Sequence, residues 1–160
     1  MELKDFSTFR IAACDLNGVM RGKRLPALDY PKLATDQIRM PLSALNVDIW
    51  GCDIAESPLV FESGDADGFL RPTERGPLPM PWLTQSSVLV PMWMFNEDGT
   101  PFSGDPRHAL AQVLDRYTKC GWQVIAATEL EFYLVDDSGS SLLPVVNPTN
   151  KSRLSASDTL

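Results

Sequence analysis

Two glutamates on one strand-like stretch are the residues of this chain with the clearest chemical potential. Residues 127–135 read Ala-Thr-Glu-Leu-Glu-Phe-Tyr-Leu-Val, and this mixture of aromatic and β-branched residues without glycine or proline predicts a buried strand. Side chains two positions apart lie on one face of a strand, about 6.5 Å apart, so we expect Glu129 and Glu131 to share a face. Carboxylates that close repel each other unless a cation neutralises them, and carboxylate oxygens are ligands that Mg²⁺ and Mn²⁺ prefer. The alternative is a solvent-facing strand whose acids serve only solubility.

A well-delimited helix precedes this stretch and would help to position it. Asp105 is a suitable N-cap and Pro106 suits the first helical position. Apolar residues then recur at helical spacing until Gly121, a candidate C-terminal cap. A strand is predicted over 122–136, so the helix and the strand form one unit that carries the two acids. The residues after it, 137–160, are polar and hold no further periodic element.

The N-terminal part of the chain predicts a hairpin. The pair Asn17-Gly18 favours a two-residue turn between strands at 9–16 and 19–25. The returning strand carries three basic residues, Arg21, Lys23 and Arg24. They fit a solvated strand edge that discourages pairing with other chains, and they also fit a contact with a subunit or an anion.

Further elements follow from local patterns. We expect a short helix at 31–39, a strand at 42–53, and a strand at 87–95 that Pro91 turns into an edge or a bulge. The turn at Asp98-Gly99 then leads to the helix described above.

The segment 56–82 is rich in loop-forming residues, and long loops are often functional. Its stretch Asp65-Ala-Asp67-Gly is typical of a turn and lacks the further acids of an EF-hand. A calcium-dependent binding module that uses Asp65 and Asp67 remains an alternative.

Composition excludes several classes of partner. The 160 residues include 14 Lys and Arg against 21 Asp and Glu, a net charge of −7, which argues against nucleic acid or an anionic membrane. No apolar run approaches a membrane span, and the first residues lack the layout of a signal peptide. Cys14, Cys52 and Cys120 predict reduced core thiols and a cytoplasmic location. A single histidine, His108, weakens any mechanism that needs a histidine base or a histidine-rich metal site within this chain.

Several short motifs in a fixed order resemble those of the glutamine synthetase family, in particular the branch that includes γ-glutamylpolyamine synthetases. The resemblance covers nearly all of this chain, but only about the first third of a typical family member. The motifs are the stretch 15–26 (Asp-Leu-Asn-Gly-Val-Met-Arg-Gly-Lys-Arg-Leu-Pro), the loop 64–68, the pair Pro81-Trp82, Asp98-Gly-Thr-Pro, Asp105-Pro-Arg and Glu129-Leu-Glu-Phe-Tyr.

The resemblance implies an α+β fold in two parts. Residues 1–104 would form a β-grasp-like N-terminal domain, and residues 105–160 would be the incomplete beginning, helix then strand, of the catalytic domain. Members of the family are homo-oligomers of two stacked rings, in which the N-terminal domain closes the active site of a neighbouring subunit. We expect the chain by itself to self-associate or to have a loosely packed C-terminal half.

The same resemblance implies a ligase that uses ATP to join glutamate to ammonia or an amine through γ-glutamyl phosphate. Glu129 and Glu131 would each bind a divalent metal ion, Mg²⁺ or Mn²⁺. Asp53 would take part in the closure between subunits. Here Trp50-Gly-Cys-Asp53 replaces the Asp-Gly-Ser-Ser loop of other members, which leaves open both the role of Asp53 and ammonia as the sole substrate. The remaining ATP and glutamate contacts would lie beyond Leu160, so the 160-residue chain alone is expected to be inactive. The alternative is a non-catalytic assembly module or a member that has lost catalysis.

Overall fold

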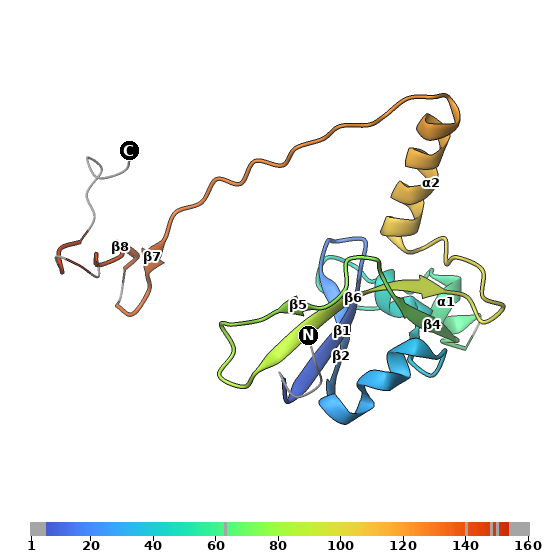
Figure 1. The fold of residues 1–160 in the computed structure, drawn as a ribbon, viewed down its shortest axis with the longest axis horizontal. Coiled ribbons are helices and arrows are strands. Elements are labelled where there is room, and N and C mark those ends of the chain that lie inside the picture. The colour runs from blue at the N-terminus through green and yellow to red at the C-terminus, as the bar shows by residue number, and fades with distance from the viewer. Residues whose placement is uncertain (1–5, 63, 140, 148, 150, 154–160) are drawn as a thin grey trace. The chain divides into compact units, whose positions relative to one another are not determined.

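The computed structural model describes residues 6–62, 64–139, 141–147, 149 and 151–153 (Figure 1). Contacts along the chain divide it into two compact units, residues 1–124 and residues 125–160. The first unit is a mixed α/β structure built on one sheet. Among its described residues, the second has a short strand pair and an isolated bridge between Val146 and Arg153.

A six-stranded sheet forms the frame of the first unit. Its strands are β1 (Thr8–Cys14), β2 (Met20–Pro26), β3 (Arg39–Pro41), β4 (Asp67–Pro72), β5 (Leu78–Pro79) and β6 (Ser87–Phe95). They follow the order β2-β1-β6-β4-β3, and β5 pairs with β6 beside this path. Only the β1–β6 pair is parallel; the other pairs are antiparallel.

The strand β6 confirms the prediction for residues 87–95, but the edge or bulge expected at Pro91 is wrong. This strand is central, with β1 on one side and β4 and β5 on the other. Pro91 lies where the pairing changes, because the β1 register ends at Pro91 and the β4 register begins at Met92. The junction accommodates a residue that has no N–H to give to a ladder.

The core of the first unit lies on this sheet. Fully buried side chains come from β1, β4, β6 and the turn before Asn46: Phe9, Ile11, Leu45, Leu70, Val90, Met92 and Met94. Phe102 adds to the same cluster from the segment after the Asp98-Gly99 turn. That turn is confirmed, since the Asn96 N–H donates to the Thr100 carbonyl and Gly99 has φ of 80°.

The predicted N-terminal hairpin is confirmed, but its connection is longer than a two-residue turn. β1 and β2 pair from Thr8–Pro26 to Cys14–Met20, which leaves residues 15–19 as the loop. β2 is an edge strand, and its exposed basic residues Lys23 and Arg24 fit the solvated-edge interpretation.

Two predictions between 31 and 53 are wrong. The expected helix at 31–39 is a 3₁₀ helix, η2, at Ala27–Ala34, and Arg39 already belongs to β3. The expected strand at 42–53 is a 3₁₀ helix, η3 (Leu42–Leu45), followed by turns. The alternating apolar residues there bury one side of an irregular backbone. The backbone turns at residues 48–52, where the Asp48 carboxylate accepts from the N–H groups of Trp50 and Cys52.

The loop-rich segment 56–82 contains a helix and two strands that its composition did not predict. It holds the single-turn helix α1 (Pro58–Phe61) as well as β4 and β5. β4 is buried at alternate positions and needs Gly68, because a Cβ there would lie 2.4 Å from the carbonyl oxygen of Phe95. Its short sequence between a glycine and a proline gave no strand pattern.

The predicted helix with Asp105 as its N-cap is confirmed as α2 (Pro106–Lys119). Asp105 accepts from the N–H of Arg107, and Gly121 follows the helix with φ of 75°. No side chain of α2 is buried, and its apolar face, which includes Leu110, Val113 and Tyr117, remains exposed within the described residues.

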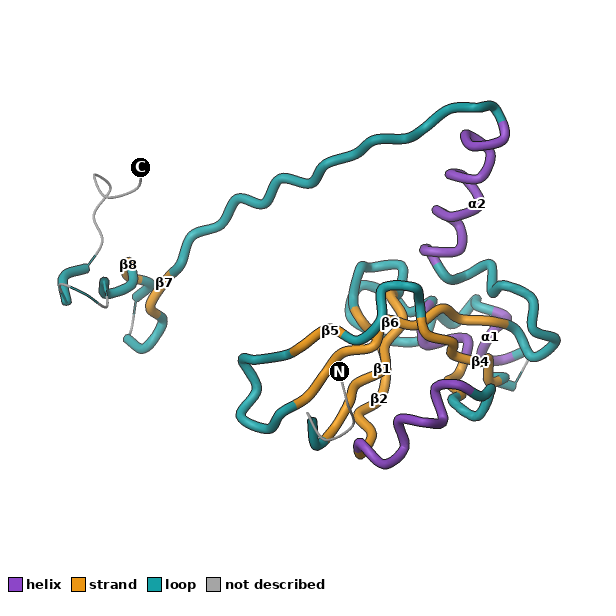
Figure 2. The backbone as a smooth tube through the Cα atoms, viewed as in Figure 1, coloured by secondary structure: helices purple, strands orange, loops and turns teal. Residues whose placement is uncertain are grey.

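The second unit contradicts the strand predicted at 122–136. Only Val135–Asp136 (β7) is a strand, paired with Leu143–Pro144 (β8), and residues 123–134 form loop (Figure 2). A strand needs a neighbour to pair its backbone N–H and C=O groups. In the described part of the chain no strand is paired with residues 123–134.

The cysteines and the helices can be compared with two expectations drawn from composition. All three cysteines are free, but Cys52 and Cys120 are exposed and Cys14 is half-buried, so the prediction of core thiols is wrong. None of the helices in the described ranges has the length and apolar character that crossing a bilayer requires.

Candidate functional site

The predicted metal-binding glutamates lie in the extended loop of the second unit. Glu129 and Glu131 are both exposed, and so are Leu130, Phe132 and Tyr133 around them. Neither carboxylate has a hydrogen bond or an ion pair in the described part of the chain. Both are therefore available as oxygen ligands, although the loop does not fix their geometry.

The two glutamates have the right ligand chemistry for a hard divalent cation, but two carboxylates are too few to complete its coordination shell. Two carboxylates are suitable ligands for Mg²⁺ or Mn²⁺, which take about six oxygen atoms. Among the described residues, no group of three or more His, Cys, Asp or Glu side chains could hold a metal ion. The rest of a coordination shell would thus have to come from water, substrate or protein outside the described residues.

Asp53 follows a turn that the side chain of Asp48 closes. The Asp48 carboxylate accepts from the N–H groups of Trp50 and Cys52 at 2.8 Å each, and Gly51 takes a φ of 83° that suits glycine. Asp53 is exposed just after this turn, and the Trp50 side chain is 82% exposed. The turn therefore presents an acid and an aromatic ring on the surface of the first unit.

The first hairpin loop supports that turn. The Asn17 side-chain amide donates to the carbonyl groups of Val47 and Asp48, both at 3.0 Å. The guanidinium of Arg21 lies so near Gly51 that a Cβ there would be 3.2 Å from it. The motif Asp-Leu-Asn-Gly at 15–18 thus has a positioning role.

Asp15 organises the hairpin loop from inside. Its buried carboxylate accepts from the backbone N–H groups of Asn17 and Val19 and from Arg21 Nε, each at 2.8 Å. Burial raises the pKa of Asp15, but these three hydrogen bonds and the charge of Arg21 outweigh it and leave the pKa below its ordinary value. The basic residue Arg21, which the sequence placed on a solvated edge or at a contact, is therefore the ion-pair partner of a buried acid.

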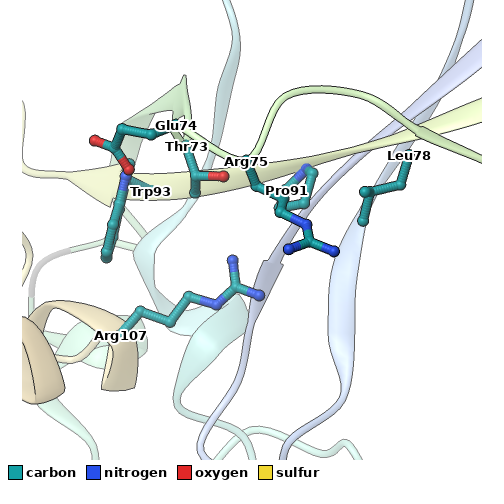
Figure 3. A pocket seen from close by; sticks show the side chains of 7 residues that line it. All are labelled: Thr73, Glu74, Arg75, Leu78, Pro91, Trp93 and Arg107. Carbon is teal, nitrogen blue, oxygen red and sulfur yellow. The ribbon is translucent and has the colours of Figure 1, made fainter. Parts of the chain in front are cut away.

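A hollow on the first unit is lined by residues to which the sequence assigned no catalytic or metal-binding role, although Arg107 belongs to the Asp105-Pro-Arg motif. We name it the arginine hollow; it has a volume of about 340 Å³ (Figure 3). It is lined by Thr73, Glu74, Arg75, Leu78, Pro91, Trp93 and Arg107. The guanidinium groups of Arg75 and Arg107 point toward one another in Figure 3, although the two residues lie in the turn after β4 and in the first turn of α2.

The predicted site residues are thus not gathered at one place. Glu129 and Glu131 belong to the second unit, whereas Asp53 belongs to the first. The structure leaves the proposed metal roles of the glutamates and the closing role of Asp53 as predictions. The calcium alternative gains no support from its own loop, since Asp65 accepts from the Ser43 hydroxyl and Asp67 begins β4.

The sequence placed Asp15 in a motif without giving it a role, and it did not predict the arginine hollow. Asp15 carries a usable signal, an acid directly before an Asn-Gly turn with an arginine six residues later. The arginine hollow carries none, because its residues come from four separate segments of the chain.

A family model matches about the last third of the chain. The family model described as "Glutamine synthetase, catalytic domain" matches residues 103–158. This range includes α2 and both Glu129 and Glu131.

Whole-chain similarity extends to several curated ligases. The chain is 32% identical over 142 residues to γ-glutamylputrescine synthetase of Escherichia coli K12, which covers 87% of this chain and 30% of that protein. It is 31% identical over 164 residues to glutamate–isopropylamine ligase of a Pseudomonas species, with 95% and 34% covered. It is 29% identical over 126 residues to glutamine synthetase of Pyrococcus furiosus, with 79% and 25% covered. The chain spans about a third of the length of the first two of these relatives.

The chain is also similar to solved structures. A structure described as a GmaS/ADP complex matches with a TM-score of 0.56 and 29% identity over 73% of this chain and 24% of that one. A crystal structure of a glutamine synthase homolog matches with a TM-score of 0.61 at 20% identity, over 75% and 28% of the two chains, which speaks for the fold alone.

Proposed function

The chain belongs to the glutamine synthetase family, and on that basis we propose that the whole protein is an ATP-dependent ligase that joins the γ-carboxylate of glutamate to ammonia or an amine. The observation that carries the proposal is the pair of unpaired carboxylates, Glu129 and Glu131, inside the segment that matches the family's catalytic domain. The chain spans about a third of its first two relatives, so the activity concerns the complete protein.

The chemistry explains why such a pair is needed. A carboxylate and an amine do not condense in water at neutral pH, so ATP first phosphorylates the γ-carboxylate of glutamate and the amine then displaces phosphate. Divalent ions, when bound, neutralise the oxygen charges of the transferring phosphoryl group. Glu129 and Glu131 would supply oxygen ligands to these ions, Mg²⁺ or Mn²⁺.

We propose that residues 127–135 become a strand when the rest of the catalytic domain packs beside them. Three apolar residues of the stretch, Leu130, Phe132 and Leu134, alternate with the two glutamates and lie exposed in the described structure. A neighbouring strand would pair the backbone, and burial of the apolar face would fix the acids on the other face.

We propose further that the complete protein has the domain and subunit arrangement that the family resemblance implies. Residues 1–104 would form a β-grasp-like domain and residues 105–160 the start of the catalytic domain. The complete protein would be a cytoplasmic homo-oligomer of two stacked rings, with Asp53 near the active site of a neighbouring subunit. The turn before Asp53 supports this role, because hydrogen bonds to Asp48 close it and the side chains of Trp50 and Asp53 are exposed.

We propose an amine, rather than ammonia alone, as the second substrate. Two of the similar ligases are described by an amine substrate, putrescine and isopropylamine. By the resemblance to the family, Trp50-Gly-Cys-Asp53 of this chain would stand where other members have Asp-Gly-Ser-Ser. An exposed indole beside an acid would favour a cationic amine with an apolar body.

The test is phosphate release by the full-length protein with glutamate, ATP and a panel of ammonia, putrescine and isopropylamine. We expect activity with at least one amine, and a loss of at least about a hundredfold in Glu129→Gln or Glu131→Gln. Glu56→Gln, which changes an exposed glutamate of the first unit, is the matched control and should keep full activity. Near wild-type turnover in both glutamate variants would end the metal assignment, and amide formation by the 160-residue chain alone would end the expectation that it is inactive.

A second candidate is a non-catalytic assembly module. It is favoured by the exposed apolar face of α2, which in the described residues has no partner. The same assay decides between the two, since an assembly module would release no phosphate with any amine.

A further inference from the structure

The arginine hollow contains two cationic side chains without an acidic partner. Among the described residues, Arg21, Arg39, Arg71 and Arg153 each form an ion pair with an aspartate or a glutamate, whereas Arg75 and Arg107 form none. Their guanidinium groups nevertheless point toward each other across the hollow (Figure 3). Two like charges that converge in this way are stabilised by an anion between them.

A third hydrogen-bonding group lies in the same wall. The hydroxyl oxygen of Thr73 is buried and has no hydrogen-bond partner in the described structure. The backbone around it is already paired, because the Thr73 N–H donates to the carbonyl of Pro91. A buried hydroxyl without a partner is uncommon and costly, so a group that accepts from it would remove a real penalty.

The first turn of α2 does not compete for this anion. Its backbone N–H of Arg107 already donates to the Asp105 carboxylate, at 2.9 Å. Arg107 therefore acts through its side chain, which is half-buried and held at the start of a capped helix. The nearby carboxylate of Glu74 opposes anion binding, but the two arginines leave the lining with a net positive charge in a chain whose total is −7.

The remaining walls of the hollow are apolar, and one of them is packed against a second ring. Trp93, Pro91 and Leu78 line the hollow, and the Trp93 ring stacks on His108 with a centroid distance of 4.7 Å. A volume of about 340 Å³ is within the range of small-molecule sites. It is too large for a bare ion, and it offers an apolar surface beside the charged end.

We propose that the arginine hollow binds a small molecule that carries a phosphate or carboxylate group on an apolar body. The oxyanion lies between Arg75 and Arg107 and accepts a hydrogen bond from the Thr73 hydroxyl, while the apolar body lies against Trp93. The site is distinct from Glu129, Glu131 and Asp53, and it does not depend on the proposed ligase activity.

The experiment uses three ring-bearing probes that differ in charge and headgroup. Phenyl phosphate, benzoate and the neutral benzyl alcohol are titrated into the 160-residue chain at constant ionic strength, and the indole N–H signal of Trp93 is followed by nuclear magnetic resonance after assignment with Trp93→Phe. We expect saturable shifts with one or both anions and none with benzyl alcohol. Binding of phenyl phosphate alone or benzoate alone supports the site and identifies its headgroup.

Variants separate a built site from general attraction. We expect Arg75→Gln and Arg107→Gln each to weaken anion binding about tenfold, and Thr73→Val to weaken it less. The matched control for the double change Arg75→Gln/Arg107→Gln is Arg24→Gln/Arg116→Gln, which removes the same charge from two exposed arginines outside the hollow. If the double variant fails to fold, an increase in the thermal midpoint of the wild type with phenyl phosphate, but not with benzyl alcohol, still reports binding.

Three results overturn the proposal. The first is the absence of a saturable shift with either anion, and the second is equal weakening in the two double variants. The third is self-association of the chain that the arginine changes abolish while neither anion binds, because the occupant would then be an acidic group of another copy.

Discussion

Residues 87–95 and residues 127–135 are two nine-residue stretches that both predict a strand from sequence, and only the first is a strand throughout. The first is β6, paired on both sides and buried at most positions. The second has no paired neighbour before Val135, and every one of its side chains is exposed. The two stretches differ in charge, because only the second carries glutamates. They also differ in their neighbours, because only the first has strands paired along it among the described residues.

The helix α2 completes the comparison. It forms over 14 residues even though none of its side chains is buried. A helix closes its hydrogen bonds within its own backbone, whereas a strand closes them only with another segment. Local sequence signals are therefore enough for the ends of α2, but the state of 127–135 depends on partners.

The sharpest test of this contrast is one substitution made in each unit. Phe9→Ala removes a fully buried ring from β1 and should lower the free energy of unfolding by about 3–5 kcal/mol. Phe132→Ala removes a ring that is 75% exposed and should change it by less than about 0.5 kcal/mol. Urea denaturation of the 160-residue chain measures both. Equal destabilisation by the two changes would mean that the second stretch is packed after all.

Much of the first unit could be predicted because its signals are local. The hairpin of β1 and β2, the strand β6 and the cap of α2 each rest on neighbours in sequence, such as Asp105 before Pro106. The strand expected at 42–53 failed because alternating apolar residues also arise in turns that bury one side, and Asp48 closes such a turn. The strand β4 was not predicted, because its position depends on the close approach of Gly68 to the backbone of β6.

The candidate sites also differ in whether local sequence or the fold brings their residues together. The chemical nature of Glu129 and Glu131 can be read from residue type and spacing, but their geometry requires a partner for the strand. Arg75 and Arg107 are 32 positions apart, since 107 − 75 is 32, and only the fold brings them to one hollow. No local pattern predicts that kind of site.

The next largest effect concerns the buried acid that shapes the first hairpin loop. Asp15→Asn leaves Arg21 without its carboxylate and weakens two backbone hydrogen bonds, at a cost of about 2–4 kcal/mol at neutral pH. Because the pKa of Asp15 is below its unfolded value, the wild type has the full contribution above about pH 4 and loses it as pH falls through the lowered pKa.

Denaturation of both proteins between pH 2 and pH 7 measures this difference. The gap in free energy of unfolding between wild type and Asp15→Asn should narrow toward acid pH. Asp53→Asn, at an exposed acid without a partner in the described chain, is the control and should leave the profile unchanged. A gap that stays constant with pH would show that Asp15 contributes through packing and not through its charge.

A smaller effect is expected where the sheet and α2 meet. The buried Asp105 carboxylate accepts from the N–H of Arg107 and also from the N–H of Met94 in β6, both at 2.9 Å. Asp105→Ala removes the helix cap and leaves a buried N–H unpaired, so it should cost about 2 kcal/mol. Asp98→Ala, which removes an exposed acid that accepts from Thr100, should cost less than about 1 kcal/mol. Thermal denaturation that ranks Asp98 above Asp105 would contradict this link between helix and sheet.

The smallest expected effect asks whether the second unit has any local order of its own. Asp136, in β7, accepts from the Ser138 hydroxyl, from the Ser138 N–H and from Arg153, and these contacts lower its pKa to about 2. Titration of its carboxyl signal by nuclear magnetic resonance should give a midpoint near that value. Ser138→Ala should raise the midpoint more than Arg153→Gln, because the Ser138 hydroxyl has the largest influence. A midpoint near the ordinary aspartate value of about 3.9 would mean that the turn between β7 and β8 opens in solution. The second unit would then lack even local order, and the rigid part of the chain would be confined to the first unit.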